Sequence, residues 1–388
     1  MGAVTGMNLI ALKMLTGDRL RYVSLVAGLA FAAMLVTQQL SIFSGFSLQM
    51  GVWIRETAVA DLWCMDEQVN FTDDFKPVPQ TRLSRIRGIA GVAWATPMYK
   101  GYMPVQLSDG TLVLCRIIGL DDATLLGAPP QMVQGKVDDL RRDKAVFINT
   151  RQAASTLSKT RSGGVPLKMG DRISINDHDA VVAGTYSASR EFFWDPVLYT
   201  TFSRALSWAP PQRKMLTYVL VKAKPGQDVN ELAQRIEATT GLGVYTNDQM
   251  DRKTTGDLLA RTGILVNFGI TTALGFVIGV LISGQTFYMF IIDNLRYFAV
   301  LKALGTTNGR IVRMVFVQTA CVGLIGYGIG AGAASIAGLL FGRIGLAFQM
   351  PWQVPVVSAF AIIVCCGGAA LLSLTRVMRL EAGIVFRN

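Results

Sequence analysis

The chain has one histidine, His178, which stands between Asp177 and Asp179, and imidazole and carboxylate groups are common metal ligands. A protein zinc site needs three or four ligands, and the sequence shows no further ligand residues at a suitable spacing. A polar turn between two strands accounts for the same three residues. We therefore expect no metal site and no bound cofactor in this chain.

The other carboxylates are scattered, and the adjacent pairs Asp73–Asp74 and Asp138–Asp139 lie in polar, loop-like stretches. We interpret these pairs as solvated surface. No G-x-S-x-G or H-E-x-x-H motif is present, so the known nucleophile and zinc-protease patterns are missing. The sequence predicts no catalytic residues, and a membrane-anchored enzyme is the least favoured class of function.

A phosphate-binding loop of the form G-x-x-x-x-G-K-[ST] is also missing from the sequence. The nearest segment is Gly-Thr-Thr-Asn-Gly-Arg at 305–310, which has the wrong glycine spacing and no lysine. The chain therefore cannot hydrolyse ATP by the P-loop route.

Composition indicates a membrane protein, because 51% of the 388 residues are hydrophobic and only 16% are charged. Four runs of 29 to 33 residues carry no charge, and about 20 apolar residues suffice to cross a bilayer core. Since ion-driven carriers usually need ionisable groups within the membrane, these runs argue against a proton- or sodium-driven carrier. The four runs are Tyr22–Ile54, Thr262–Ile292, Met314–Gly342 and Ile344–Thr375.

The first run could also belong to a cleaved signal peptide, whose apolar core is roughly 7–15 residues long. With 33 residues it is more than twice that length, which favours a retained anchor. Before it, residues 7–20 have an amphipathic pattern and predict a short helix on the membrane surface. A plain extension of the first span is the alternative, but Gly17 followed by two charges favours a break.

The net charge of +11 is unevenly distributed. Residues 55–261 contain 26 Lys/Arg and 23 Asp/Glu, whereas the rest of the chain contains 11 basic and 3 acidic residues. All of those basic residues except Arg343 flank the spans on one side, which the positive-inside rule assigns to the cytoplasm. We expect a multi-pass protein of the bacterial inner membrane, with both termini cytoplasmic and residues 55–261 periplasmic. Membrane lipids are then expected partners, and nothing points to nucleic acid.

Residues 55–261 predict an α+β domain, because short apolar runs alternate with turn residues and two amphipathic helices. A strand–helix–strand order begins the domain and recurs near its end. The predicted fold class is therefore four transmembrane α-helices plus a large extracytoplasmic α+β domain, in which two βαβ halves flank a β-rich insertion. Strands are predicted at 59–65, 91–97, 112–119, 145–148, 172–175, 180–186, 216–222 and 243–245, and helices at 79–86 and 229–239.

The five cysteines do not by themselves indicate a disulfide framework. Cys321, Cys365 and Cys366 fall in spans and are expected to be small packing residues. Cys64 and Cys115 share the oxidising side of the membrane, so a disulfide between them is allowed. Nothing in the sequence shows that they meet.

Small residues mark the second and third spans, including Gly275 and Gly279 in one and Gly328 and Gly332 in the other. Helices in lipid associate closely through such residues. Packing within the four-helix unit and dimerisation of two chains explain these glycines equally well.

The loop at 293–313 is short and basic. Tyr297, Val300, Leu301 and Leu304 follow the i, i+3, i+4, i+7 spacing of one helical face, and Gly305 suits a left-handed helix end. A short helix is therefore expected between the second and third spans. The residues alone do not separate an interfacial anchor from a docking element.

The stretch 295–311, Leu-Arg-Tyr-Phe-Ala-Val-Leu-Lys-Ala-Leu-Gly-Thr-Thr-Asn-Gly-Arg-Ile, resembles the signature loop of MacB/FtsX-type ABC transporter permeases. It is most similar to the DevC branch, whose permeases lack a fused ATPase. Residues 16–21, 170–175, 181–185 and 379–386 also resemble that family. The similarity covers essentially the whole chain, and the order of one span, a large outer domain and three spans is its most specific feature.

Two positions depart from the family pattern. Tyr297 stands where an acidic residue is frequent, and Glu381–Ala382 stands where Asp-Pro is frequent. Tyr297 has no carboxylate, so it cannot form the ion pair to an ATPase that an acidic residue would form there.

The resemblance implies a non-catalytic permease subunit of an ATP-driven transporter. A separate cytoplasmic ATPase would bind ATP and Mg²⁺, and its movement would pass through a coupling helix and the first two spans to the outer domain. The ATPase-coupling residues would be Leu295, Arg296, Tyr297, Val300, Leu301, Lys302, Leu304 and Gly305.

The resemblance also implies a second permease copy forming a homodimer, a HlyD-like membrane-fusion adaptor and an outer-membrane channel for export or efflux. Extraction of lipids or lipoproteins is a second interpretation, and FtsX-like regulation of a cell-wall enzyme is a third.

The predicted parts follow the chain in order. They are a cytoplasmic N-terminal helix (1–21), span one with its stalk (22–54), the periplasmic domain (55–261), span two with its stalk (262–292), the coupling loop (293–313), span three (314–342), a short outer loop with span four (343–375) and a cytoplasmic tail (376–388).

Overall fold

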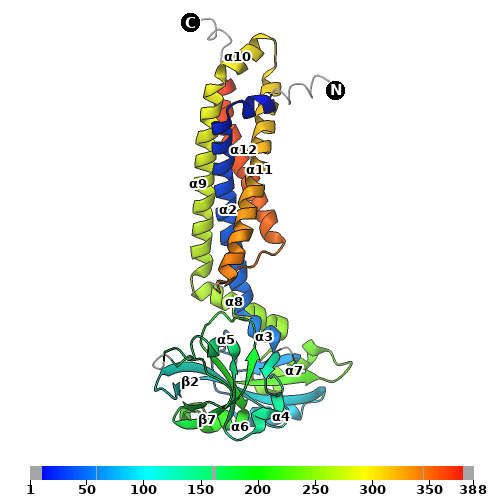
Figure 1. Cartoon of the computed structure of the whole chain (residues 1–388). Coiled ribbons are helices and arrows are strands. Elements are labelled where there is room, and N and C mark those ends of the chain that lie inside the picture. The colour runs from blue at the N-terminus through cyan, green and yellow to red at the C-terminus, as the bar shows by residue number, and fades with distance from the viewer. Residues whose placement is uncertain (1–10, 58, 160–162, 344, 379–388) are drawn as a thin grey trace. The chain divides into compact units, whose positions relative to one another are not determined.

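The computed structural model describes residues 11–57, 59–159, 163–343 and 345–378, and residues 372–378 by their backbone alone. The chain divides into two compact units (Figure 1). We call Met1–Phe46 with Gly263–Asn388 the helical unit, and Ser47–Thr262 the sheet unit.

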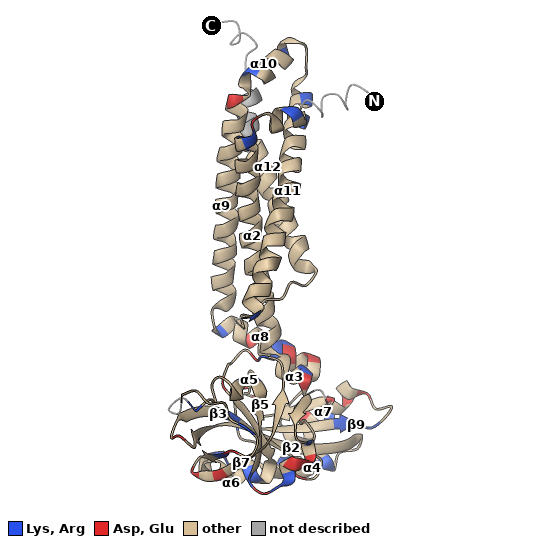
Figure 2. Cartoon of the chain, in the orientation of Figure 1, with Lys and Arg blue, Asp and Glu red and all other residues tan. Residues whose placement is uncertain are grey.

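Four helices of the described residues are long and apolar enough to cross a membrane. At a rise of about 1.5 Å per residue, each exceeds the roughly 30 Å of a hydrocarbon core. Figure 2 shows no charged residue along the middle of this helical unit. The helices are α2 (Arg19–Met50), α9 (Ile264–Asp293), α11 (Asn308–Arg343) and α12 (Gln353–Met378).

The chain changes direction just before α2. Residues 11–17 are helical, Asp18 forms a bend, and its carboxylate accepts hydrogen bonds from the backbone N–H groups of Leu20 and Arg21. Arg21 then pairs with both Asp18 (2.9 Å) and Asp293 (2.7 Å). A side-chain oxygen that caps the first turn explains why a new helix starts here. The predicted amphipathic segment before residue 11 and the tail after residue 378 lie outside the described residues.

Two of the four predicted packing glycines pack within the helical unit. A side chain at Gly279 would meet the Cβ atom of Ala32, and one at Gly275 would meet Leu35, so both glycines let α9 approach α2. Gly328 and Gly332 have open space around them instead. Of the two explanations left open by the sequence, packing within one helical unit therefore accounts for Gly275 and Gly279 but not for this pair.

The glycines that bring α11 close to its neighbours are different ones. Gly326 and Gly330 lie against Leu29 and the Ala30–Met34 backbone of α2, and Gly323 lies against Cys366 of α12. They recur at intervals of three and four residues, so they form one helical face. Gly328 and Gly332 fall on another face of α11.

The sheet unit contains a ten-stranded sheet with the main order β10-β1-β9-β2-β3-β8-β5-β7-β4. The two predicted βαβ halves are present, but they interleave: β9 lies between β1 and β2, and β1 lies between β9 and β10. This is the split βαβ arrangement of ferredoxin-like folds. The halves consist of β1 (Leu62–Met65), α4 (Gln80–Arg87), β2 (Val92–Leu107), β9 (Tyr218–Ala223), α7 (Val229–Thr240) and β10 (Gly243–Thr246).

The insertion between the halves extends the same sheet. Two of its pairings, β3 with β8 and β5 with β7, are parallel, and β6 pairs with both β2 and β7. Strands β4 and β8 and the short helices were not expected from the sequence. The elements are β3 (Leu112–Leu120), β4 (Gln131–Gln134), η1 (Val137–Arg141), β5 (Ala145–Asn149), α5 (Thr150–Ala153), β6 (Arg172–Ile175), β7 (His178–Ser187), β8 (Val197–Thr201), α6 (Phe202–Trp208) and η3 (Pro211–Arg213).

Alternating residues of the strands enter two different cores. Leu62 and Cys64 of β1 face the core that contains residues of α4 and α7, whereas Trp63 and Met65 face a second core. The second core receives Trp53 of α3 (Val52–Glu56) and Met250 of α8 (Asn247–Arg261). The period of two along a strand produces this division.

The polar residues around His178 form a strand-to-strand turn, as predicted. Asn176 and Asp177 both have positive φ (47° and 65°) and join β6 to β7. Asn and Asp are among the residues that tolerate this two-residue turn geometry. Within the described residues, no group of three or more His, Cys, Asp or Glu could hold a metal ion.

Cys64 and Cys115 are free thiols, so the allowed disulfide is not formed in this structure. Burial raises the pKa of both thiols well above the usual value. Because the thiolate is the reactive form, both groups should be chemically inert.

Substituting Gly330 with leucine should destabilise the helical unit. The new side chain would overlap the backbone of α2, and overpacking costs about 1–3 kcal/mol or more. Gly269→Leu in α9 is the matched control, because its side chain would enter open space. Membrane abundance and the thermal unfolding midpoint in detergent are the measurements. Equal effects of the two substitutions would contradict this packing.

Candidate functional site

The loop between α9 and α11 contains the expected short helix, α10 (Leu295–Ala303). Asn294 separates it from α9, and the Asn294 side chain donates a hydrogen bond to the Phe290 carbonyl (2.8 Å). Gly305 follows with φ of +88°, a backbone conformation that glycine adopts without strain. The helix is therefore held between two defined ends.

One face of α10 is buried. Phe298 joins an apolar cluster that includes Phe290 and Ile291 of α9 and Ile311 of α11, and the neighbouring Ala299 is also buried. The sequence analysis missed this face, because the cluster that covers it forms only when α9 and α11 come together. The buried pair anchors α10 to the helical unit.

The predicted apolar face of α10 turns outward. Tyr297, Val300 and Leu304 are 62%, 44% and 78% exposed, while Leu301 and Lys302 are half-buried. Exposed apolar residues grouped on one rigid helix are suited to docking against another protein. The predicted coupling residues therefore share one short helix and its end, although their role is not tested by this geometry.

A second candidate lies in the sheet unit, where charged side chains are buried. Lys100 and Tyr102 lie two residues apart on β2, so they share a face, and Arg116 of β3 pairs directly with Tyr102. Lys100 and Arg116 are almost completely inaccessible to solvent. Buried charges are costly unless they are paired, so their partners decide whether this sheet is stable.

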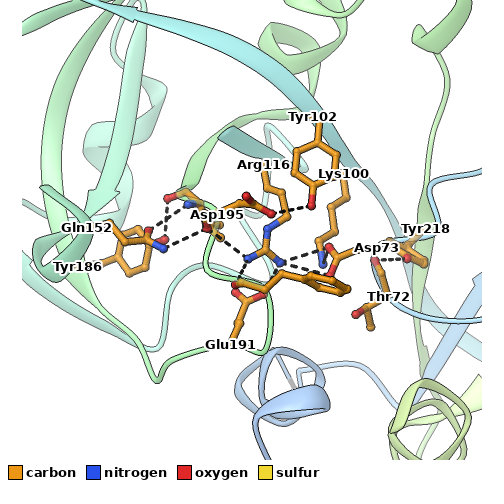
Figure 3. A network of polar contacts seen from close by, with 12 residues as sticks. Thr72, Asp73, Lys100, Tyr102, Arg116, Gln152, Tyr186, Glu191, Asp195 and Tyr218 are labelled. Atoms are coloured by element: carbon orange, nitrogen blue, oxygen red, sulfur yellow. Dashed lines mark hydrogen bonds and ion pairs between the residues drawn. The ribbon is translucent and has the colours of Figure 1, made fainter. Parts of the chain in front are cut away.

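Two acidic side chains from two loops pair with these cations, and a third, Asp195, pairs with Tyr102 (Figure 3). Asp73 accepts from Lys100 (2.9 Å) and from Arg116 (3.3 Å), and Glu191 also pairs with Arg116. The second guanidinium nitrogen of Arg116 donates to the carbonyls of Phe193 (3.0 Å) and Asp195 (3.3 Å). Tyr102 donates its hydroxyl to the Asp195 carboxylate (2.9 Å).

The opposite charges counteract the effect of burial on the pKa of each of these groups. Burial by itself raises the pKa of Asp73, but the charges of Lys100 and Arg116 outweigh it and leave that pKa below its usual value. Burial lowers the pKa of Arg116, but Glu191 and Asp73 raise it overall. Burial also lowers the pKa of Lys100, and Asp73 offsets part of this effect.

The interpretation of Asp73 as solvated surface is therefore wrong. Its side chain is 6% exposed, and that of Asp139 is only 15% exposed, whereas the Asp138 side chain is 81% exposed, as expected. One feature of the sequence indicates a buried ion pair. Arg116 lies inside the apolar run Leu-Val-Leu-Cys-Arg-Ile-Ile-Gly, where an arginine needs buried partners. The sequence could not show which carboxylates those would be.

Comparison with known protein families covers both units. A family model described as "MacB-like periplasmic core domain" matches residues 24–239, more than half of the chain. A second model, "FtsX-like permease C-terminal", matches residues 269–382. The chain belongs to the MacB/FtsX-like ABC transporter permeases. The sheet unit is thus its extracytoplasmic, MacB-like domain, and the four long helices are its membrane spans.

This permease is 23% identical to an uncharacterized ABC transporter permease of Mycobacterium tuberculosis, found in two strains. The match extends over 299 residues, 74% of this chain and 75% of the relative.

Two solved structures resemble the permease over about half of its length. The periplasmic region of MacB from Actinobacillus actinomycetemcomitans matches with a TM-score of 0.35 and 13% identity, covering 51% of this chain and 94% of that one. The extracellular domain of the noncanonic ABC-type transporter YknZ from Gram-positive bacteria has a TM-score of 0.34 and 12% identity, covering 48% and 98%.

An ABC transporter permease is a non-catalytic subunit that works with an ATPase. This agrees with a sequence that lacks a phosphate-binding loop. The buried ions of the sheet unit pair with one another, and Arg116 also bonds loop carbonyls, so we assign them a structural role.

Asp73→Asn should destabilise the sheet unit by about 3–5 kcal/mol, because it leaves Lys100 without a buried counter-ion. Urea unfolding of the full chain, followed by tryptophan fluorescence, measures the loss. Asp138→Asn removes an exposed pair and should change stability by at most about 1 kcal/mol.

The same substitution should also change the dependence on pH. Since the pKa of Asp73 is lowered in the fold, its contribution is complete above the unfolded-state pKa of about 3.9 and is lost as the pH falls further. Wild type and Asp73→Asn should therefore converge in acid. A constant difference down to low pH would contradict the assignment.

Proposed function

We propose that this chain is the force-transmitting permease of an ATP-driven exporter and that α10 is the element that receives the ATPase. The observation that carries the proposal is the exposed apolar face of α10, formed by Tyr297, Val300 and Leu304 on a helix anchored between two spans. A chain without its own phosphate-binding loop needs such a contact to use ATP. Leu295, Arg296, Leu301, Lys302 and Gly305 complete the coupling segment.

The orientation in this proposal puts α10 and both termini in the cytoplasm and the sheet unit in the periplasm of a bacterial inner membrane. The excess of basic residues that flank the spans on the side of α10 supports it. ATP-driven closure of the ATPases would then tilt α2 and α9, and the sheet unit would move with the ends of those helices.

The permease is proposed to act as a homodimer. Gly328 and Gly332 support this, because they are exposed on α11 and make no close contact within one chain. Small residues on a span let a second helix approach closely, and an outward-facing pair leaves that approach to another chain.

We further propose that the exporter is of the DevC-like kind, working with a HlyD-like membrane-fusion adaptor and an outer-membrane channel. The match of both units to permease family models supports the permease part of this proposal. Affinity purification of the full-length permease tests which partner it has. Co-purification of an adaptor supports export. Co-purification of a lipoprotein would favour lipoprotein extraction instead, and that of a cell-wall hydrolase would favour regulation of that enzyme.

Leu301→Asp should weaken binding of the ATPase about tenfold or more, because a carboxylate would be buried against an apolar contact. Gly305→Pro should have a similar effect, since proline cannot adopt the positive φ found there. Leu301→Met keeps the apolar surface and is the matched control. The amount of ATPase that co-purifies with each variant in nanodiscs, and its hydrolysis rate, are the measurements.

Full retention of ATPase binding and stimulation by Leu301→Asp would refute the docking role. Membrane insertion should be unchanged in all three variants, and its loss would show that the substitution acts on folding.

Labelling of introduced cysteines tests the orientation. Lys224→Cys, in a loop of the sheet unit, should react with a membrane-impermeant maleimide in cells whose outer membrane alone is opened. Thr307→Cys, beside α10, should react only after the inner membrane is opened as well. The reverse pattern would exclude the proposed topology. Wild type serves as the background, because Cys64 and Cys115 are buried.

A further inference from the structure

The first-span helix continues into the sheet unit and packs there. Trp53 of α3 is buried, with its ring 5.2 Å from Trp63 of β1 and 6.1 Å from Tyr218 of β9. We call residues 47–57 the stalk end. Its aromatic side chain fixes it against the sheet, but one ring by itself leaves the backbone around it free to tilt.

A loop from another part of the chain holds that backbone. Residues 188–196, which join β7 to β8 and which we call the strap, bond to the stalk end twice. The Phe192 N–H donates to the Gln49 carbonyl (3.2 Å), and the Ser189 N–H donates to the Glu56 carboxylate (3.0 Å). These bonds lie about two helical turns apart along the stalk end, so the strap contacts both of its ends.

The strap has no regular secondary structure and depends on Arg116 for its position. Arg116 bonds Glu191, the Phe193 carbonyl and the Asp195 carbonyl, three points within five residues. Gln152 of α5 adds one bond to the Asp195 carbonyl (3.1 Å). The guanidinium is therefore the main group that joins the strap to the central strands.

The same ion network also reaches the stalk end from the sheet side. The Lys100 ammonium lies 3.6 Å from the centre of the Trp53 ring, and Asp73 bridges Lys100 to Arg116. A cation over a buried aromatic face is attractive, and more so without water. The stalk end is thus enclosed between Lys100 on one side and the strap on the other, with both organised by one cluster of charges.

We propose that the strap is a clamp that makes the stalk end and the periplasmic domain move as one body, and that Arg116 is the positioning residue that keeps the clamp closed. Its role in transmitting movement rests on the proposed function. The clamp itself does not, because it is a property of this chain alone.

Hydrogen–deuterium exchange of the full chain in lipid nanodiscs, without ATPase, tests the clamp. Glu191→Gln removes the charge that faces Arg116, and amides at 188–196 and 47–57 should exchange at least about tenfold faster while β2, β3 and β5 stay protected. Glu191→Asp keeps the charge and should restore part of the protection. Asp138→Asn breaks an exposed ion pair outside the strap and should leave both segments unchanged.

A network that serves only domain stability would give a different result. Glu191→Gln would then raise exchange over the whole sheet, or leave the stalk end as protected as in wild type, and either result overturns the clamp. If Glu191→Gln does not fold, Glu56→Ala serves instead, because it removes one strap bond without touching a buried charge. Faster exchange of both segments in this variant supports the clamp, and unchanged exchange overturns it.

Reconstitution of the permease with its ATPase distinguishes the clamp from the proposed function. Clamp variants that keep ATPase binding should lose the response of the periplasmic domain to ATP. If no ATPase binds the wild-type permease, the proposed function fails while the exchange results on the clamp still stand.

Discussion

Hydrocarbon excludes charge, and this exclusion organises the whole chain. Each span must satisfy its backbone polar groups by forming a helix, and it must carry no ionisable side chain along its length. Without a hydrophobic drive between helices, close approach then depends on small residues such as Gly279 against Ala32 and Gly330 against the α2 backbone. The four charge-free runs of the sequence accordingly contain no Asp, Glu, His, Lys or Arg.

The periplasmic domain differs from the spans, because it buries charged side chains inside its folded core. Its interleaved βαβ halves put β9 and β1 in the middle of one half-sheet, and the insertion lengthens the other half through β3 and β8. Arg116 lies where the two parts meet, on the strand next to β2. Two loops supply the carboxylates that pair with its guanidinium. Burying this charge costs free energy unless it is paired, and the pairing also fixes the path of those loops.

In the proposed mechanism two regions pass on movement, and each is anchored in an apolar core. At α10, Phe298 is buried among residues of the spans while Tyr297 on the same short helix is exposed. At the stalk end, Trp53 is buried in the sheet while Gln49 and Glu56 are bonded to the strap. The α10 region joins a span to the proposed ATPase contact, and the stalk end joins a span to the sheet. We assign no catalytic residue to either region.

The sequence alone was enough for the features that depend on local composition. The long runs without charge predicted the four spans, and short apolar runs separated by turn residues predicted most strands. The spacing of apolar residues at 295–305 predicted α10 with its left-handed Gly305. These features follow from backbone geometry and solvent, which act on neighbouring residues. The Asn176–Asp177 turn beside His178 belongs to the same class.

Other features were decided by contacts between residues far apart in the chain. Asp73 looked like a solvated loop residue until Lys100 and Arg116 were brought beside it, and Gly330 rather than Gly332 became the packing glycine because of the way α11 faces α2. No local pattern encodes which carboxylate neutralises a buried arginine or which helical face meets a neighbour. Those choices arise only when the sheet closes and the helices pack, because burial and pairing energies depend on distance in space.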